Sequence, residues 1–158
     1  MKTPRAKVLF VCIGNSCRSP MAEAIALRDA AQEMEPSSAG LAPLGFVADM
    51  TTQTLLKNGY AVDGLTSKPI SSEAWESADI VINMSGRARE FAFRNFTGHT
   101  KVEDWEIEDP YGDAAKYQGT YESIQRRVAE LARLLREEPE APDGGSNDAP
   151  AASPLNKN

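Results

Sequence analysis

The chemically most suggestive residues lie close to the N-terminus. Cys12 and Arg18 are separated by five residues, which is enough for the backbone to curl into a cradle whose N–H groups point inward at an anion. The residues in between are Ile13, Gly14, Asn15, Ser16 and Cys17. A helix N-terminus and a nearby cation favour the ionised form of a thiol, so Cys12 is a candidate nucleophile. Arg18 offers a planar guanidinium that can hold two phosphate oxygens, so the spacing predicts a phosphate-binding loop with a reactive cysteine.

Three neighbouring residues suit this chemistry. Gly14 and Asn15 tolerate the unusual dihedrals that a tight curl requires. Ser19 can donate its hydroxyl to the Cys12 sulfur or help the sulfur leave, and it can also cap the helix that follows. A Cys-x5-Arg spacing alone is weak evidence, because a cysteine that ends a strand can be a small buried hydrophobe. The catalytic interpretation is favoured because the strand, the loop and the helix start agree.

The elements around the loop alternate between apolar runs and helical patterns, which is typical of a parallel sheet covered by helices. Residues 8–12 predict the first strand. A helix at 19–33 follows, with Ser19 as its N-cap, Pro20 at its first position and Glu23 in its first turn. The loop thus lies at the carboxyl end of a strand, where open α/β sheets bind their ligands.

Weaker sequence patterns predict the remaining helices and strands of a single domain at 1–137. We expect a short helix capped by Ser71 or Ser72, helices at 49–58 and 86–93, and strands at 37–40, 79–83 and 100–105. A helix at 117–137 is the clearest element, because apolar residues recur at three- and four-residue spacing from Tyr121 to Leu135, which indicates a core-facing stripe. Residues 138–158 are rich in Pro, Gly, Ala, Asp, Asn and Ser and predict a disordered tail.

Composition narrows the function classes. A formal net charge of -6 over 158 residues argues against a protein that binds nucleic acid by neutralising its phosphates. No apolar run approaches the ~20 residues of a membrane span, and the apolar stretch at 8–13 reads as a buried strand and not as a signal peptide. We therefore expect a cytoplasmic protein with no membrane partner.

Two cysteines and one histidine lack the ligand set of a zinc site, so we expect no metal. We also expect no cofactor, and a monomer.

The stretch Val11-Cys12-Ile13-Gly14-Asn15-Ser16-Cys17-Arg18-Ser19-Pro20 strongly resembles the low-molecular-weight protein tyrosine phosphatase family. Ser38-Ala39-Gly40 resembles the family's second-strand motif, and Asp109-Pro110-Tyr111 resembles the loop that carries its general acid. The likeness covers about residues 7–137. It implies an α/β fold with a four-stranded parallel sheet and helices on both faces.

The resemblance also implies an activity, that of a tyrosine phosphatase acting on a phosphotyrosine protein or a small aryl phosphate. Cys12 would attack phosphorus while Asp109 protonates the departing phenol oxygen, and water would then hydrolyse the cysteinyl phosphate with Asp109 as base. Without the resemblance, Asp109 is one of several acidic residues near an Asp-Pro turn. Tyr111 and Ile13 would form the walls of a slot for a flat aryl group.

Further expectations concern the surroundings of the loop. The resemblance implies a hydrogen bond between Asn15 and Ser38. Cys17 can form a reversible disulfide with Cys12, which would shield the nucleophile from irreversible oxidation. Leu65 stands where many members carry histidine, which weakens the expected support of the loop.

The arginines at positions 87, 89 and 94 leave two interpretations open. They form either a basic rim that guides an acidic peptide or a set of solvated charges, and the second is the commoner outcome on a surface helix.

Two other functions also remain open. Thioredoxin-coupled arsenate reductases are similar in fold and loop, and Ser16 together with residues 105–110 leans toward them. Those reductases pass a disulfide through two further cysteines, one of them at a position where this chain has Asn83-Met84-Ser85. A reductase that uses an external thiol is still conceivable, because arsenate mimics phosphate.

A non-catalytic anion-binding or redox-sensing module would need the same loop without a general acid. Ser16 also replaces the apolar residue usual in the phosphatases, which makes the pocket floor more polar and the preference for phosphotyrosine weaker.

Overall fold

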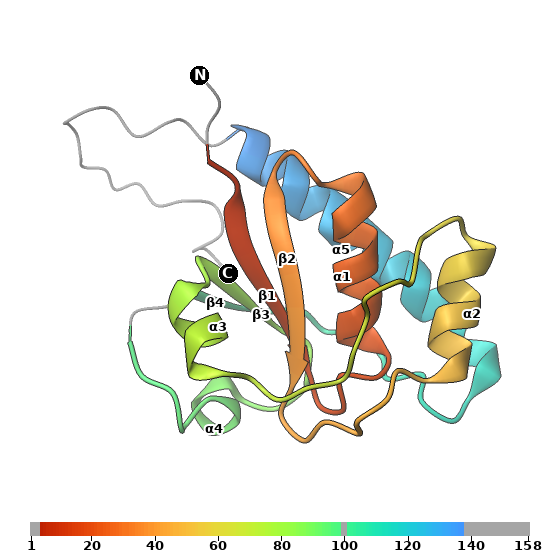
Figure 1. Cartoon of the computed structure of the whole chain (residues 1–158), viewed down its shortest axis with the longest axis horizontal. Coiled ribbons are helices and arrows are strands. Elements are labelled where there is room, and N and C mark those ends of the chain that lie inside the picture. Colours follow the sequence, from red (N-terminus) through yellow and green to blue (C-terminus); the bar gives the residue numbers. More distant parts are fainter. Residues whose placement is uncertain (1–3, 99–100, 138–158) are drawn as a thin grey trace.

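The computed structural model describes residues 4–98 and 101–137, and the predicted tail at 138–158 lies outside them. Four parallel strands form one sheet in the order β2-β1-β3-β4 (Figure 1). The strands are β1 Ala6–Cys12, β2 Met34–Gly40, β3 Ile80–Asn83 and β4 Lys101–Asp104. The helices are α1 Arg18–Asp29, α2 Asp49–Lys57, α3 Ser72–Ser77, α4 Arg89–Ala92 and α5 Tyr117–Glu137, and a 3-10 turn, η1, spans Ala114–Lys116. The predicted four-stranded parallel sheet is confirmed.

β1 lies in the interior of the sheet, with β2 on one side and β3 on the other. Its side chains alternate between the two faces, as the strand period of two residues requires. Val8 and Phe10 belong to the larger core, whereas Leu9 and Val11 belong to the smaller one. All four side chains are almost fully buried. Because both faces are covered, the strand reads in the sequence as a continuous apolar run.

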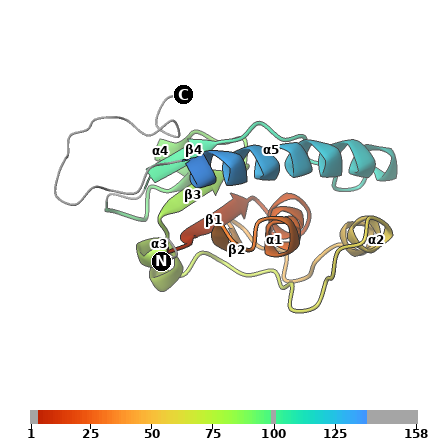
Figure 2. The same ribbon diagram turned by 90° about the horizontal axis from the view of Figure 1, so that it is seen from above.

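Helices cover both faces of this sheet, as predicted. Figure 1 shows α1 and α5 on one face and α3 and α4 on the other. The apolar stripe of α5 is buried in the larger core, and Figure 2 shows this helix running from the sheet to the region of α2, with which it is in contact. On the other face, Trp75 of α3 packs against Phe93 and Phe96. None of the described helices is long and apolar enough to cross a membrane.

The start of α1 differs from the prediction. The helix begins at Arg18, its N-cap residue is Cys17, and no side chain caps it. The predicted cap at Ser19 is therefore wrong, and Glu23 lies beyond the first turn. The reason is that the loop passes directly into helical geometry: the N–H of Met21 donates to the carbonyl of Cys17 at 3.2 Å. Ser19 is consequently inside the helix, and its hydroxyl is available for other contacts.

Other predicted boundaries also shift, and α1 ends at Asp29 and not at residue 33. β2 begins before residue 37 and contains Pro36, which is tolerated because β2 is an edge strand, where a missing N–H removes no ladder bond. α4 is shorter than the predicted 86–93 because a tight polar turn precedes it. In that turn Asn83 Oδ1 accepts from the Ser85 hydroxyl at 2.6 Å, and Gly86 has a φ of 80°. At α3, Ser71 is the cap, since its side chain accepts from the N–H of Ala74.

Candidate active site

The loop between β1 and α1 directs its carbonyl groups outward. The carbonyl oxygens of Cys12, Ile13, Gly14 and Ser16 accept hydrogen bonds from backbone N–H groups of residues 41–48, at distances of 2.8 to 3.1 Å. Within the described parts of the chain, no N–H group of residues 13–18 donates to a protein acceptor. Because the carbonyl side of the loop is bonded outward, these N–H groups remain for an anion held inside the curl.

Asn15 holds the loop in this shape. Its φ of 48° lies in the left-handed region, and its side chain is fully buried. The amide Nδ2 donates to Ser19 Oγ at 2.7 Å and to Ser38 Oγ at 3.1 Å, which confirms the hydrogen bond expected between Asn15 and Ser38. Asn15 Oδ1 accepts from the N–H of Lys68 at 2.9 Å, and the Ser38 hydroxyl donates to Glu23 Oε1 at 2.6 Å. All polar atoms of this amide are therefore satisfied.

Gly40, at the end of β2, supports the loop from behind. A Cβ atom added to Gly40 would lie 2.7 Å from the carbonyl oxygen of Ile13 and 2.9 Å from the backbone nitrogen of Asn15. The loop thus packs directly on the backbone of Gly40, which only glycine permits. Leu65 packs against the core and does not contact the loop through a polar group, but the Ser67 hydroxyl donates to the carbonyl of Gly14 at 3.0 Å. Support from this segment therefore comes from residues that follow position 65.

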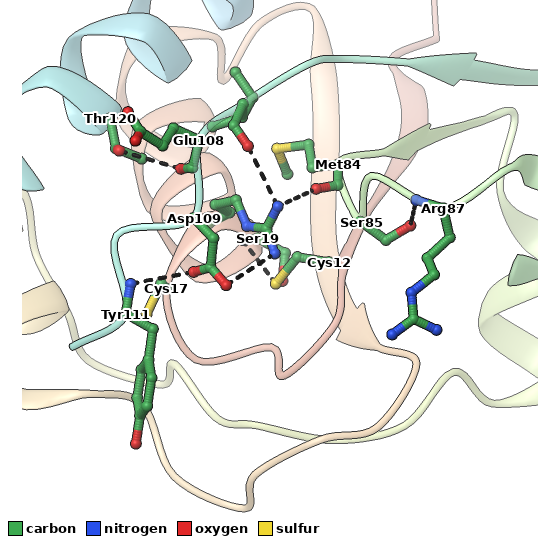
Figure 3. A network of polar contacts seen from close by, with 12 residues as sticks. Cys12, Cys17, Ser19, Met84, Ser85, Arg87, Glu108, Asp109, Tyr111 and Thr120 are labelled. Atoms are coloured by element: carbon green, nitrogen blue, oxygen red, sulfur yellow. Dashed lines mark hydrogen bonds and ion pairs between the residues drawn. The ribbon is translucent and has the colours of Figure 1, made fainter. Parts of the chain in front are cut away.

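The Cys12 sulfur receives two polar contacts from Ser19. Its Sγ lies 3.1 Å from Ser19 Oγ and accepts from the N–H of Ser19 at 3.4 Å (Figure 3). Since Ser19 Oγ already accepts from Asn15, its own hydrogen can be donated to the sulfur, which is nearer than the carbonyl of Ala39 at 3.4 Å. Both contacts stabilise negative charge on a sulfur located at the N-terminus of α1.

Arg18 presents one edge of its guanidinium to the site. Nη1 donates to the carbonyl oxygens of Met84 at 2.6 Å and Ile107 at 3.3 Å, which follow β3 and β4 (Figure 3). Nη2 lies 3.5 Å from Asp109 Oδ2. Nε is buried and has no hydrogen-bond partner among the described residues. A guanidinium edge formed by Nε and Nη2 can bind a tetrahedral anion with two parallel hydrogen bonds, and the unsatisfied Nε donor fits such a ligand.

Asp109 reaches the site from the loop after β4. Its Oδ1 accepts from the N–H of Tyr111 at 3.2 Å, and its side chain is 52% exposed. The Thr120 hydroxyl on α5 donates to the carbonyl of Glu108 at 3.2 Å, which fixes the backbone just before Asp109. The backbone before Asp109 is thus fixed by this bond, and the half-exposed carboxyl group faces Arg18.

Cys17 is buried beside the loop and is a free thiol, as is Cys12. Its sulfur lies 3.1 Å from the hydroxyl of Tyr117. Burial raises the pKa of the Cys17 thiol above its ordinary value of 9.0, which the hydrogen bond with Tyr117 partly opposes. Cys17 therefore stays protonated near neutral pH.

The candidate residues converge on one cavity of about 190 Å³. The sequence-predicted residues that line it are Cys12, Ile13, Gly14, Ser16, Cys17, Arg18, Asp109 and Tyr111. Asn15 and Ser19 lie behind the loop and not in its wall. Ala42 and Leu44 also line the cavity, and no sequence pattern predicts them because the segment at 41–48 has no periodicity. In the part of the chain that the structure describes, no three His, Cys, Asp or Glu side chains are grouped so that they could hold a metal ion.

Ser16 does not leave its hydroxyl open to the cavity. The hydroxyl donates to the carbonyl of Phe46 at 2.8 Å, and the residue is buried. The carbonyl of Ser16 accepts from the Thr51 hydroxyl at 2.9 Å. This residue therefore ties the loop to residues 46–51, and the cavity wall around it remains largely apolar.

The protein thus has an α/β fold in which a cysteine and an arginine share one loop at the carboxyl edge of the parallel sheet, and the geometry of this loop suits a phosphate group. The family model described as "Low molecular weight phosphotyrosine protein phosphatase" matches residues 7–141. The chain therefore belongs to the low molecular weight phosphotyrosine protein phosphatase family, which confirms the resemblance inferred from its motifs.

Individual relatives cover most of the chain. The low molecular weight protein-tyrosine-phosphatase YfkJ of Bacillus subtilis (strain 168) is 35% identical in an alignment of 138 residues, and the match covers 74% of this chain and 85% of that protein. The arsenate reductase of the same organism is 32% identical in an alignment of 134 residues, and the match covers 82% of this chain and 92% of that protein. The solved structure of YwlE arginine phosphatase from Geobacillus stearothermophilus has 25% identity and a TM-score of 0.73, and the match covers 83% of this chain and 93% of that one. The chain is thus similar to phosphatases, which supports a hydrolase, and also to arsenate reductases.

Proposed function

We propose that the protein hydrolyses aryl phosphate monoesters, with phosphotyrosine in a protein as the substrate class, through a cysteinyl-phosphate intermediate. The observation that carries the proposal is the common cavity of the Cys12 sulfur, the Arg18 guanidinium and the Asp109 carboxyl group. These are the groups that a nucleophile, an anion clamp and a general acid require. The family match and the phosphatase relatives support the same reaction.

In the first step the Cys12 thiolate attacks phosphorus and the bond between phosphorus and the phenol oxygen breaks. Asp109 gives its proton to that oxygen, and the Nε and Nη2 edge of Arg18 follows the phosphoryl oxygens through the transition state. In the second step water attacks the cysteinyl phosphate, Asp109 takes a proton from the water, and the sulfur leaves as a thiolate. The Ser19 hydroxyl, 3.1 Å from Cys12 Sγ, stabilises the departing sulfur.

The shape of the cavity supports an aryl substrate. Ile13, Leu44 and Ala42 provide apolar contacts, and Tyr111 provides an exposed aromatic face next to Asp109. A flat ring can pack between such walls and place its ester oxygen near the acid. A shorter alkyl phosphate would reach the loop without these contacts.

The test is release of nitrophenol from nitrophenyl phosphate by the wild type, Cys12→Ser and Asp109→Asn. We expect Cys12→Ser to be inactive, and Asp109→Asn, which keeps the size of the side chain, to lose about 10²–10⁴ in kcat. A fully active Cys12→Ser protein would refute the mechanism. Phosphotyrosine and phosphoserine versions of one peptide then test the substrate class, since equal rates would contradict the aryl preference.

The relatives supply a second candidate, arsenate reduction. The thiolate and the anion-binding loop suit arsenate, but the chain has no cysteine beyond Cys17, so an external thiol has to complete the reaction. Turnover of arsenate with glutathione or thioredoxin, without ester hydrolysis, would favour this candidate. Because one similar structure is an arginine phosphatase, a phosphoarginine peptide belongs in the same substrate panel.

A further inference from the structure

A second hollow lies beside the cavity that contains Cys12. This hollow, of about 410 Å³, is lined by residues 40–42, by residues 69–70 and by residues between Arg87 and Phe96, and we call it the α4 groove. Ile13 and Ala42 line both hollows and separate them. A bound peptide that extends from the cavity across Ile13 and Ala42 therefore enters the α4 groove.

The charge of the α4 groove is opposite to that of the protein as a whole. The chain has a formal net charge of -6, yet the lining of the groove contains Arg87 and Arg94 and no carboxylate. Neither arginine forms an ion pair with any described residue, and both guanidinium groups lie beside Phe91, at 6.0 Å and 4.6 Å from its ring centroid. These contacts with the ring limit the freedom of both side chains while their charges stay in water. Figure 3 shows Arg87 on the side of Cys12 that is opposite to Tyr111.

Arg89 of the same segment behaves differently. It pairs with Asp104 at 2.8 Å and does not line the groove. The three arginines that the sequence presents as one set are thus divided by the structure into two that face the groove and one that is neutralised elsewhere.

The same end of the molecule also exposes apolar surface. Phe91 is 51% exposed and lies between the two groove arginines. Leu44 and Tyr111, at the neighbouring cavity, are also among the few large apolar side chains that remain exposed. Apolar surface that is gathered around a site and bordered by charge is characteristic of a surface that binds another molecule.

We propose that the α4 groove binds the segment of a substrate protein that adjoins the phosphorylated residue, and that Arg87 and Arg94 recognise an acidic side chain in that segment. The inference rests on the proposed function, since the phosphorylated residue has to occupy the cavity. An extended chain advances about 3.3–3.6 Å per residue, so the groove is within reach of the first few residues beyond Ile13 and Ala42. The unpaired positive charge of the groove selects Asp or Glu there, and a small aryl phosphate does not reach it.

The experiment compares two phosphotyrosine peptides that differ only in having glutamates or alanines at the three positions on each side of the phosphotyrosine. The measured quantity is the ratio of kcat/KM for the acidic peptide to that for the neutral peptide. We expect the double variant R87Q/R94Q to lower this ratio about three- to tenfold, as expected for two exposed charge pairs. Each single variant, Arg87→Gln and Arg94→Gln, should lower the ratio by part of this amount. Arg89→Gln is the matched control for the single variants, because it removes one positive charge from the same segment outside the groove, and it should leave the ratio unchanged. All variants should hydrolyse nitrophenyl phosphate like the wild type.

Two results would overturn the inference and leave the proposed function intact. One is an equal preference for both peptides in the wild type, and the other is an equal loss of preference in Arg89→Gln, which would show unspecific attraction by net charge. If instead the wild type hydrolyses no phosphate ester, the proposed function fails. The groove is then tested by the binding of the same two peptides, labelled with a fluorophore, to the Cys12→Ser protein. Equal affinities would reject the groove, and tighter binding of the acidic peptide that depends on Arg87 and Arg94 would support it.

Discussion

Replacing Gly40 with alanine tests whether the anion-binding loop depends on a contact outside its own sequence. The new Cβ atom would lie 2.7 Å from the carbonyl oxygen of Ile13 and 2.9 Å from the backbone nitrogen of Asn15. Non-bonded contacts of carbon are normally about 3.5 Å, so the loop would have to move by roughly 0.6 to 0.8 Å. Both opposing atoms belong to the backbone, and no side-chain rotation can remove the overlap.

This displacement sets the size of two measurable effects. Overpacking of this kind costs about 1–3 kcal/mol in the free energy of unfolding, which lowers the Tm of a protein of this size by about 2–12 °C. A misplacement of about 1 Å can cost 10²-fold in rate, so we expect kcat/KM for nitrophenyl phosphate to fall about ten- to hundredfold. The loss of activity at a temperature well below the Tm would then report on the loop and not on global unfolding.

The assay needs a glycine-to-alanine change that meets no obstacle. Gly119 lies in α5, and a Cβ atom there would have nothing within 4 Å. Gly119→Ala should stabilise the protein by about 0.5–1 kcal/mol and leave the hydrolysis rate unchanged. The reasoning would be refuted by a Gly40→Ala protein with wild-type kcat/KM, or by one whose loss of rate is matched by Gly119→Ala.

Three further predictions concern the loop itself. Arg18→Lys should lower kcat/KM for nitrophenyl phosphate by about 10²–10⁴. One ammonium group cannot replace both the bond to Met84 and two charge-assisted bonds to phosphate, and each of the latter is worth about 1.5–3 kcal/mol. An unchanged kcat/KM would contradict the proposed role of Arg18. Ser19→Ala removes the hydroxyl that contacts Cys12 Sγ and should lower kcat by about ten- to hundredfold with little change in KM in steady-state assays. Burial raises the pKa of Cys17, so the folded protein keeps a proton that the unfolded thiol loses, and the free energy of unfolding should fall as the pH rises above about 8.5. Urea unfolding at about pH 7 and about pH 9.5 checks the sign, and Cys17→Ser should weaken this dependence.

Strong local patterns account for the parts of the fold that the sequence predicts well. The continuous apolar run of β1 and the three- and four-residue spacing in α5 each have one physical reading, and both elements are found within two residues of the predicted bounds. At α1 the Ser-Pro signature suggested a cap at Ser19, but the preceding loop is shaped by contacts with residues 41–48, which bring Arg18 into the helix already. A local signature cannot report such long-range contacts.

The candidate site also contains residues that the sequence predicts and residues that it does not. Cys12 and Arg18 belong to one contiguous loop, so their spacing alone predicts that they act together. Asp109 was identified only through the family resemblance, because a turn aspartate has no local property that places it opposite an arginine far away in the sequence. Leu44 and Gly40 were missed as supports of the site, since their importance depends on how two distant segments approach the loop.

Because the loop depends on hydrogen bonds to residues outside it, its sequence alone cannot transfer its function to another protein. Transplanting residues 12–19 into the strand–helix junction of an unrelated scaffold would carry over the cysteine and the guanidinium but not the donors from residues 41–48, nor the glycine on which the loop rests. The freed carbonyl groups could then turn inward and repel the anion. A working graft therefore has to include the end of the neighbouring strand and the segment that follows it, so the smallest transferable unit is two adjacent strand ends and not one motif.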